Sequence, residues 1–429
     1  MMERYREYKE SGVKWLGEIP SHWEVKRLGS FFSERKEKVS DQDYAPLSVT
    51  KQGIFPQLEN VAKTNDGDNR KLVKEGDFVI NSRSDRKGSS GVSELDGSVS
   101  LINLVLQPRK TIFGPFCNYL LKSYGFIEEN YRNGRGIVAD LWTTRYNEMK
   151  MIKVAMPSLE EQKTISSYLD TATSEIDKAI AMQQKMIDLL NERKQIIIQN
   201  AVTKGLDENV EMKESGVEFV NEIPHNWPTR RLKFSAWIRA RLGWKGLKAS
   251  EYVENGYPFL SAFNIENDHM KWNNLNFINK YRYDESPEIK LKVGDLLLVK
   301  DGAGIGKCAR IDKLPYGEST ANGSLAVITS YDMLDYRYLY YFMVSKSFKD
   351  HTELLINGMG VPHFTQGEMK KIVMPVPPQA EQQQIVTYLD GEMEKFDSAI
   401  TNCQRQITLL KERKQIIINE VVTGKVRVS

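Results

Sequence analysis

One stretch of the sequence occurs twice, and it limits the chain to folds that contain two long helices. Residues 161–203 and 381–423 align at an offset of 220 positions, and ERKQIII recurs letter for letter at 192–198 and 412–418. Apolar or small residues return at steps of three, four or seven in both copies, which is typical of one stripe along a helix. Such a helix extends roughly 60 Å at 1.5 Å per residue, so its stripe needs a partner along its whole length, and the second copy offers one.

The stripe also predicts which side chains pack between the two helices. If the first helix carries the chain away from one domain, the second must run back for the stripes to meet, which predicts an antiparallel coiled coil with an approximate two-fold axis. The packing residues expected from the pattern are Ile165, Leu169, Ile176, Ile180, Ile187, Leu190 and Ile197 in the first copy and Ile385, Leu389, Phe396, Ile400, Ile407, Leu410 and Ile417 in the second.

A second, shorter repeat marks the beginning of each half. Residues 9–28 and 213–232 share KESGV, EIP, a tryptophan and RL at an offset of 204 positions. Glycine and proline within the segment disfavour a long helix. We therefore expect an extended segment that Ile19, Trp23 and Leu28 anchor onto a core.

The regions between these repeats predict two globular domains. Short β-rich runs alternate with clusters of Gly, Asn, Asp and Ser, and GDFVIN at Gly76 corresponds to GDLLLVK at Gly294, whereas the loops between strands differ in length and content. We expect an α+β chain: two globular domains of mixed α/β content, separated by two long helices packed as an antiparallel coiled coil, in a pseudo-two-fold repeat. The expected boundaries are 1–155 for the leading segment and first domain, 156–206 for the first helix, 207–375 for the second leading segment and domain, and 376–429 for the second helix and tail.

Composition limits the class of protein. The chain is 40% hydrophobic and 27% charged, and no apolar run reaches the length that spans a membrane. The polar N-terminus is unlike a secretory signal, and Cys117, Cys308 and Cys403 fit neither a disulfide framework nor a zinc site, so we expect a protein of the reducing cytoplasm. With a net charge of only +3, a nucleic-acid surface has to come from locally concentrated Lys and Arg.

The motifs of several enzyme classes are absent. KDGAGIGKCA at Lys300 has Asp301 where a phosphate-binding loop needs Gly, and Cys308 where it needs Ser or Thr. Methyl transfer to an amino group calls for an Asn/Asp-Pro-Pro-aromatic loop, and the only Pro-Pro, Pro377–Pro378, is followed by Gln379. The five histidines show no metal-ligand spacing. We expect neither a catalytic constellation nor a metal site.

The loops instead carry hydrogen-bond donors suited to DNA. Arg and Lys neutralise phosphates or reach the guanine edge, and Asn and Gln pair with the adenine edge. In the first domain the candidates are Asn81, Ser82, Arg83, Ser84, Arg86, Lys87, Arg132, Arg135, Thr143, Thr144 and Arg145. In the second domain they are Arg239, Arg241, Lys245, Lys248, Asn264, Lys300, Lys307, His363, Thr365 and Gln366.

One arrangement occurs twice: a segment with KESGV, EIP, Trp and RL, then a variable region, then a helix that closes with ERKQIII. Over the whole chain, this arrangement resembles the specificity subunit of type I restriction-modification systems. The resemblance implies two target recognition domains, each reading one half of a bipartite site in double-stranded DNA, with the helices as spacer. It implies two modification subunits as partners. It places S-adenosylmethionine and ATP on partner subunits, with no cofactor and no catalysis in this chain, and it leaves open whether restriction subunits join.

Two other classes stay open on the sequence alone. One is a self-contained DNA methyltransferase or nuclease, against which the missing motifs count, and binding of S-adenosylmethionine by the isolated chain would distinguish it. The other is a coiled-coil scaffold for protein partners without a DNA role. The divergence of polar loops on a repeated frame argues against a scaffold, because a scaffold has no need of two different loop sets.

Overall fold

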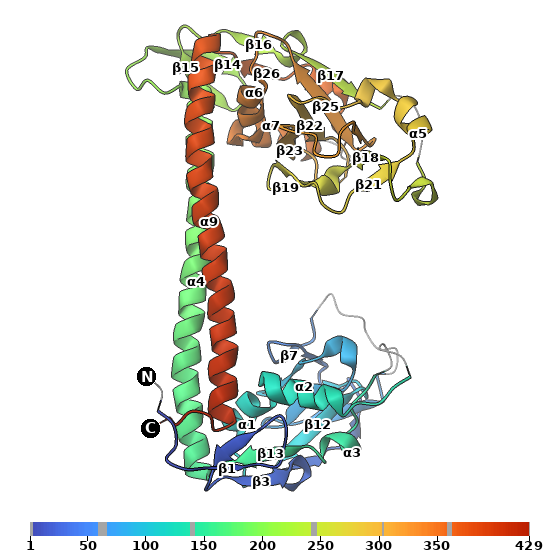
Figure 1. The fold of residues 1–429 in the computed structure, drawn as a ribbon, viewed down its shortest axis with the longest axis vertical. Coiled ribbons are helices and arrows are strands. Elements are labelled where there is room, and N and C mark those ends of the chain that lie inside the picture. Colours follow the sequence, from blue (N-terminus) through green and yellow to red (C-terminus); the bar gives the residue numbers. More distant parts are fainter. Residues whose placement is uncertain are drawn as a thin grey trace. The chain divides into compact units, whose positions relative to one another are not determined.

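The computed structural model forms two compact units that share two long helices. It describes residues 3–58, 67–137, 142–241, 247–302, 304–357 and 363–428. Unit 1 comprises Met1–Gln184 and Gln404–Ser429, and unit 2 comprises Lys185–Cys403. Each unit therefore contains a globular domain, one end of α4 (Leu159–Lys204) and one end of α9 (Gln379–Val422) (Figure 1). The predicted α+β class and the two long helices are confirmed.

Unit 1 is an α+β domain whose elements precede α4 in the chain. They are β1 (Tyr8–Glu10), β2 (Glu18–Pro20), β3 (Glu24–Arg27), β4 (Phe32–Glu34), β5 (Lys38–Val39), β6 (Leu47–Val49), β7 (Ile54–Pro56), β8 (Arg70–Val73), β9 (Phe78–Asn81), β10 (Ser90–Val92), β11 (Gly97–Val99), β12 (Asn103–Pro108), α1 (Gly114–Leu121), α2 (Tyr124–Arg132), α3 (Tyr146–Met149) and β13 (Lys153–Met156). An antiparallel sheet in the order β10-β9-β12-β4 forms the centre, and a smaller sheet has the order β11-β8-β5.

Unit 2 repeats this plan between α4 and α9. Its elements are β14 (Met212–Val217), β15 (Val220–Pro224), β16 (Thr229–Arg231), β17 (Ala236–Ala240), β18 (Tyr257–Leu260), β19 (Ile265–Glu266), β20 (His269–Met270), β21 (Asn276–Ile278), α5 (Lys280–Asp284), β22 (Asp295–Val299), β23 (Cys308–Arg310), β24 (Thr320–Ala321), β25 (Leu325–Ser330), α6 (Tyr336–Val344), α7 (Lys346–Asn357), α8 (Gln366–Met369) and β26 (Val373–Pro375). Its central sheet, in the order β17-β25-β22-β23, matches that of unit 1 strand for strand.

A tryptophan in each leading segment joins the domain to the helices. Trp23 and Trp227 are fully buried. The indole Nε1 of Trp23 donates to Glu161 at the start of α4 over 3.0 Å, and that of Trp227 donates to Glu381 at the start of α9 over 2.9 Å. Gly424 lies against the Trp23 ring just after α9 ends, and Gly205 lies against the Trp227 ring just after α4 ends. In each unit the start of one long helix thus meets the end of the other, so the two helices run antiparallel.

A buried glutamine repeats the same three hydrogen bonds at each helix start. Gln162 accepts from the Phe113 amide at 2.8 Å and donates to the carbonyls of Thr111 and Pro157. Gln382 accepts from the Asp335 amide at 2.8 Å and donates to the carbonyls of Met333 and Pro377. Because each glutamine satisfies backbone groups of a loop and of its own helix, it fixes how the domain sits on that helix.

Ion pairs and apolar side chains hold the helix segments of each unit together. Asp177 pairs with Lys414 in unit 1 at 2.6 Å, and Asp397 pairs with Lys194 in unit 2 at 2.7 Å, and these residues are repeat equivalents of one another. The predicted packing residues that are buried are Ile165, Leu169, Ile176, Ile187, Ile385, Leu389 and Ile417. Those that are half-buried are Ile180, Leu190, Ile197, Phe396, Ile400, Ile407 and Leu410. Full burial is frequent where a globular domain also covers the helices, as around Ile165 and Ile385.

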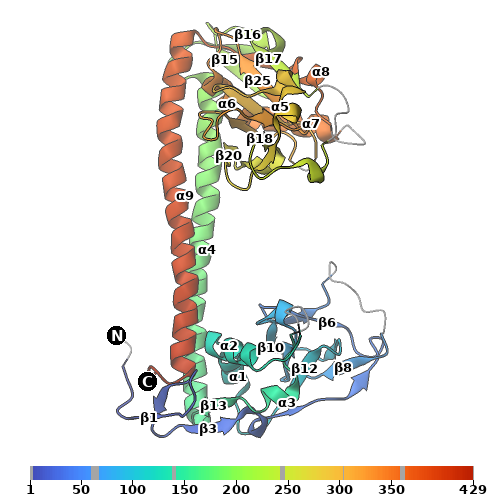
Figure 2. The same cartoon turned by 45° about the vertical axis from the view of Figure 1, so that its right-hand side comes forward.

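The leading segments are short strands, as the glycines and prolines suggest. Ile19, Trp23 and Leu28 are all completely buried, which confirms their expected role as anchors. The two ends of the described chain meet in unit 1, where the Arg427 amide donates to the Glu3 carbonyl at 2.8 Å (Figure 2). Within the described residues, no helix is both long and apolar enough to cross a membrane.

Candidate functional site

The two groups of polar candidates in unit 1 lie next to each other. Ser82 follows directly after β9, and its carbonyl accepts from the Thr144 amide at 3.0 Å. Two further backbone bonds join Thr143 to Arg135, at 2.9 and 3.0 Å. The chain segment around residue 143 thus pairs with the chain just beyond the end of β9 and brings residues separated by about sixty positions of sequence into one surface.

An open groove of about 490 Å³ borders this surface. Its charged lining consists of Lys36, Lys71, Arg83 and Arg145 together with the carboxylate of Glu34. Glu34 lies 3.4 Å from the Lys71 ammonium and 3.5 Å from that of Lys36, so it offsets only part of the positive charge. A groove with four cations and one carboxylate attracts a polyanion such as the phosphate backbone of DNA.

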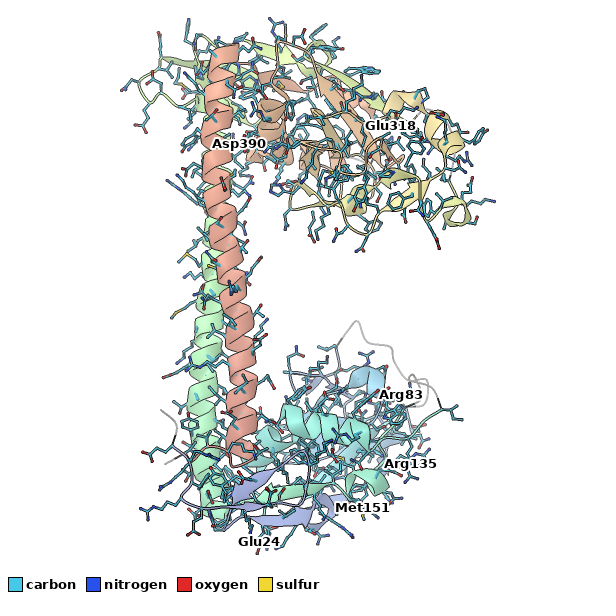
Figure 3. The ribbon with its side chains drawn as sticks, viewed as in Figure 1. Glu24, Arg83, Arg135, Met151, Glu318 and Asp390 are labelled. Carbon is cyan, nitrogen blue, oxygen red and sulfur yellow. The ribbon has the colours of Figure 1, made fainter. Side chains whose placement is uncertain are left out.

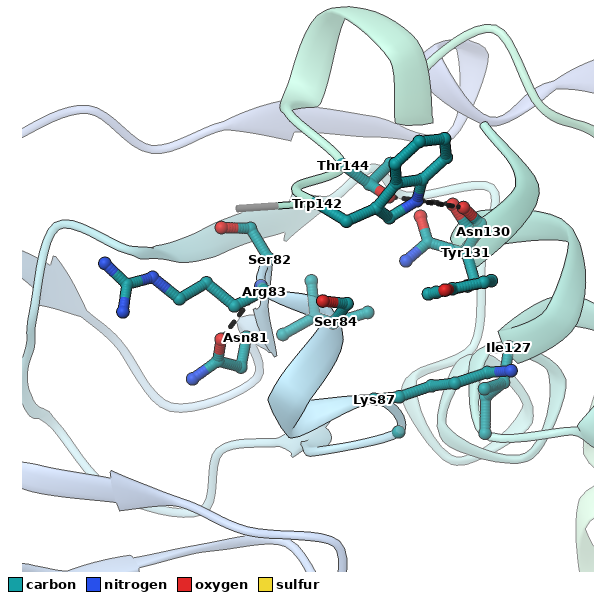
Figure 4. A pocket seen from close by; sticks show the side chains of 12 residues that line it. Asn81, Ser82, Arg83, Ser84, Lys87, Ile127, Asn130, Tyr131, Trp142 and Thr144 are labelled. Atoms are coloured by element: carbon teal, nitrogen blue, oxygen red, sulfur yellow. Dashed lines mark hydrogen bonds between the residues drawn. The ribbon is translucent and has the colours of Figure 1, made fainter. Parts of the chain in front are cut away.

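A small pocket shares Ser82 and Arg83 with the groove (Figure 4). The Trp142 indole donates to the Tyr131 carbonyl at 2.8 Å, and the two rings lie 6.0 Å apart. The Lys87 ammonium sits 4.4 Å from the Tyr131 ring centre and pairs with Glu128 at 2.7 Å. With a volume of about 20 Å³, the pocket has room for roughly one water, so we assign it to packing and not to ligand binding.

The remaining candidates of unit 1 differ in how available they are. Arg83, labelled with Arg135 in Figure 3, is exposed. Arg135 is 83% exposed and pairs with Glu148 at 3.5 Å, and Arg86 is exposed beside Asp85. Thr144 is buried, and its hydroxyl donates to the Asn130 carbonyl. It therefore supports the loop from inside and offers no donor at the surface. Asn81, Ser82 and Ser84 line the small pocket, and Arg132 pairs with Glu129.

Unit 2 has a corresponding surface at the end of β22. The Phe364 amide donates to the Lys300 carbonyl at 2.8 Å, which is the repeat equivalent of the Thr144 to Ser82 bond. The Asp301 carboxylate accepts from His363 Nδ1 and pairs with the Lys300 ammonium at 2.5 Å. Partial burial raises the pKa of Asp301, but the bonds from Lys300 and His363 outweigh it and hold the pKa below the ordinary value. Asp301 is therefore ionised at neutral pH.

Two arginines expected to face DNA are buried in ion pairs instead, which corrects the expectation. Arg239 is only 5% exposed and pairs with Asp295 at 2.9 Å. Arg241 pairs with Glu285 at 3.2 Å, and its side chain is 7% exposed. Both arginines follow β-strand spacing onto the inner side of the domain, where an acidic partner compensates the charge.

The other candidates of unit 2 fall in several places. Asn264 is buried, and its carboxamide oxygen accepts from the Ser261 amide, so it supports a loop. The Thr365 hydroxyl caps α8, and Gln366 is the first residue of that helix. Lys307 borders a pocket that also contains Glu266 and Asp268. Lys248 is exposed, and Lys245 lies outside the described residues.

Several residues at these surfaces were not predicted from the sequence. Lys36, between β4 and β5, and Lys71, in β8, line the unit 1 groove from places far apart in sequence, and nothing local distinguishes them from other surface lysines. Asp301 carries a clearer signal, because aligning the two halves at an offset of 218 places it at the position of Arg83. Among the described residues, no group of three or more His, Cys, Asp or Glu side chains is arranged to hold a metal.

The known proteins that resemble this chain include specificity subunits of type I restriction enzymes. Residues 243–411 match the family of the type I restriction modification DNA specificity domain. The type I restriction enzyme MjaVIII specificity subunit of Methanocaldococcus jannaschii is 26% identical over 98% of this chain and 97% of its own length. The EcoKI specificity subunit of Escherichia coli K12 is 24% identical over 49% of this chain and 44% of its own.

Solved structures show the same fold at low sequence identity. A chain from a type I R-M system, solved for its complex assembly and conformational transition, matches with a TM-score of 0.70 and 16% identity, covering 94% of this chain and 98% of its own. The HsdS subunit of Thermoanaerobacter tengcongensis matches with a TM-score of 0.50 and 18% identity, covering 95% and 98%.

Proposed function

This chain belongs to the specificity subunits of type I restriction-modification systems, and from that premise we propose how it selects DNA. Each unit reads one half of a bipartite site in double-stranded DNA, and methyl transfer is carried out by modification subunits that bind this chain. The observation that carries the proposal is that the two units repeat one frame and differ in the polar loops at the end of β9 and of β22. Two different reading surfaces on one frame suit a target made of two different half-sites.

The experiment that tests this function is single-molecule methylation mapping. DNA from cells that express this chain with its neighbouring modification subunit is compared with DNA from cells that lack this chain. We expect a bipartite motif with a methylated adenine that disappears with the chain. Identical methylation in both cells, together with no DNA binding by the purified complex, would favour the scaffold alternative.

Independence of the two reading surfaces has its own test. Exchanging residues 31–154 for the corresponding domain of a relative should change one half-site and leave the other unchanged. Trp23, Glu161 and Gln162 lie outside that segment and are retained, and within it Gln162 contacts only backbone groups, those of Thr111 and Phe113. A change in both half-sites would contradict independent reading.

The long helices are proposed to set the gap between the half-sites. Inserting seven residues into both α4 and α9 keeps the apolar stripe in phase and adds roughly 10 Å, or about three base pairs. We expect a longer gap between unchanged half-sites. Insertion of five residues is the matched control, because it rotates the stripe and should impair assembly instead of lengthening the gap.

Exposed apolar side chains on the helices support docking of the modification subunits. In unit 2, Leu189 is 50% and Ile196 is 43% exposed, and their repeat equivalents in unit 1, Leu409 and Ile416, are 48% and 55% exposed. Large apolar side chains that recur at the same place on two helices are typical of a protein interface. Changing Leu189 and Leu409 to Glu should reduce copurification of the modification subunit, whereas Thr401→Glu, at an exposed polar position of α9, should not.

A further inference from the structure

The end of β9 in unit 1 and the end of β22 in unit 2 share a turn glycine and an antiparallel bridge. The turn between β9 and β10 closes at Gly88 with a φ of +79°, and the turn between β22 and β23 closes at Gly306 with a φ of +90°. Antiparallel bridges then join Arg83 to Thr143 in unit 1 and Asp301 to His363 in unit 2. Because the glycines, the bridges and the flanking backbone bonds all correspond, Arg83 and Asp301 occupy the same position of the shared frame.

In unit 1 this position presents only hydrogen-bond donors. The Arg83 amide is held by the Asn81 side chain at 3.0 Å, which fixes the backbone from which the side chain leaves. The side chain extends away from the Trp142 and Tyr131 pair and borders the groove (Figure 4). Its guanidinium forms no ion pair with a carboxylate of the described residues, so its fork of N–H donors is available to a ligand.

In unit 2 the same position presents acceptors. The Asp301 side chain is 35% exposed, and it orients the imidazole of His363, which is 48% exposed, through Nδ1. The Asp301 carboxylate, which also accepts from the Lys300 ammonium, therefore offers lone pairs where unit 1 offers N–H groups.

We propose that this strand-end position reads a base in each half-site and that it gives the two units opposite preferences. Arg83 selects guanine, whose O6 and N7 both accept in the major groove. Asp301 with His363 selects a base that donates from an exocyclic amino group there, which is cytosine through N4 or adenine through N6. The inference rests on the proposed function and names the chemistry of the bases that its two reading surfaces take.

The test uses the full chain with its modification subunit and compares methylation motifs of variants. Arg83→Ala should relax a guanine in one half-site, with a loss of discrimination of roughly 5- to 150-fold at that base. Arg83→Lys keeps the charge but loses the bidentate fork, so it should also reduce discrimination while the salt dependence of binding stays unchanged. Asp301→Asn should change the other half-site only, at a cytosine or an adenine. The untouched half-site reports that each variant is folded.

The control is Arg27→Ala, because Arg27 is exposed in β3, away from the loops that carry the DNA-binding candidates, and does not line the groove. It should leave the motif unchanged. If Arg83→Ala instead weakens binding equally for all sequences and lowers the salt slope by about one, the side chain contacts phosphate and the inference is overturned. A wild-type motif that neither Arg83→Ala nor Asp301→Asn alters would overturn it as well. A wild-type complex without any bipartite motif would overturn the proposed function, and with it this inference.

Discussion

The central sheets of the two units share one strand order, whereas the smaller sheets do not. In unit 1, β8 pairs antiparallel with both β11 and β5, but in unit 2, β18 pairs antiparallel with β21 and parallel with β24. The central sheet lies under a helix that contacts a long helix: the Tyr119 hydroxyl of α1 donates to Asp170, and the Tyr341 hydroxyl of α6 donates to Asp390. The central sheet and the helix that contacts α4 or α9 are therefore repeated in the two units, whereas the smaller sheet differs between them.

A buried ion pair shows how far this repetition extends into the core. Arg35 pairs with Asp77 at 2.7 Å in unit 1, and Arg239 pairs with Asp295 at 2.9 Å in unit 2, at equivalent positions of the frame. Each aspartate also accepts a backbone amide three residues before it, from Lys74 at 2.9 Å and from Lys292 at 2.8 Å. The pairs differ in burial, with side-chain exposures of 16% and 3% in unit 1 and of 5% and 0% in unit 2.

The largest expected effect comes from breaking these pairs. Asp295→Ala leaves Arg239 buried without its partner, and we expect unit 2 to lose about 3–5 kcal/mol of unfolding free energy. Asp77→Ala should cost unit 1 less, because Arg35 retains some contact with water. Hydrogen exchange of β22 and β9 localises each loss to its unit, and Asp312→Ala, at a half-exposed carboxylate, is the control. Equal losses in the two units would contradict the argument from burial.

These pairs also show what sequence could and could not predict. The long helices could be predicted from the helical spacing of apolar residues, and the anchoring role of Trp23 could be predicted from the repeat of its segment. Arg239 was not, because an arginine in a strand looks the same whether it faces water or a buried Asp295. The repeat held the missing signal: Arg35 recurs as Arg239 with the frame, whereas Arg83 is replaced by Asp301. A position that recurs belongs to the frame, and one that changes is the better candidate for recognition.

An intermediate effect is expected from the repeated glutamines. Gln162→Leu removes the acceptor of the Phe113 amide and the donor to two carbonyls, and Gln382→Leu does the same in unit 2. Leaving buried backbone groups unsatisfied costs about 1–3 kcal/mol, and the two contact sets are alike, so we expect similar losses in both units. Thermal unfolding of the single variants measures the cost. Gln406→Leu, at the exposed surface of α9, is the matched control, and a difference above about 1 kcal/mol between the two units would show that the helix starts are not equivalent.

The smallest effect is expected from the two equivalent ion pairs between the long helices, Lys194 with Asp397 in unit 2 and Lys414 with Asp177 in unit 1. Exposed pairs contribute about 0.2–1 kcal/mol. Lys194 is 18% exposed, and its partner Asp397 lies 3.7 Å from His269. Lys414 is 26% exposed and lies near Lys122, whose pKa is lowered by burial and by the charge of Lys414. Double-mutant cycles should therefore give a larger coupling energy for Lys194 with Asp397 than for Lys414 with Asp177. The cycles are measured at pH 8, because burial and Lys194 lower the pKa of His269 and keep it neutral there. The reverse order of coupling would mean that neighbouring charges, and not burial of the lysine, set the strength of these pairs.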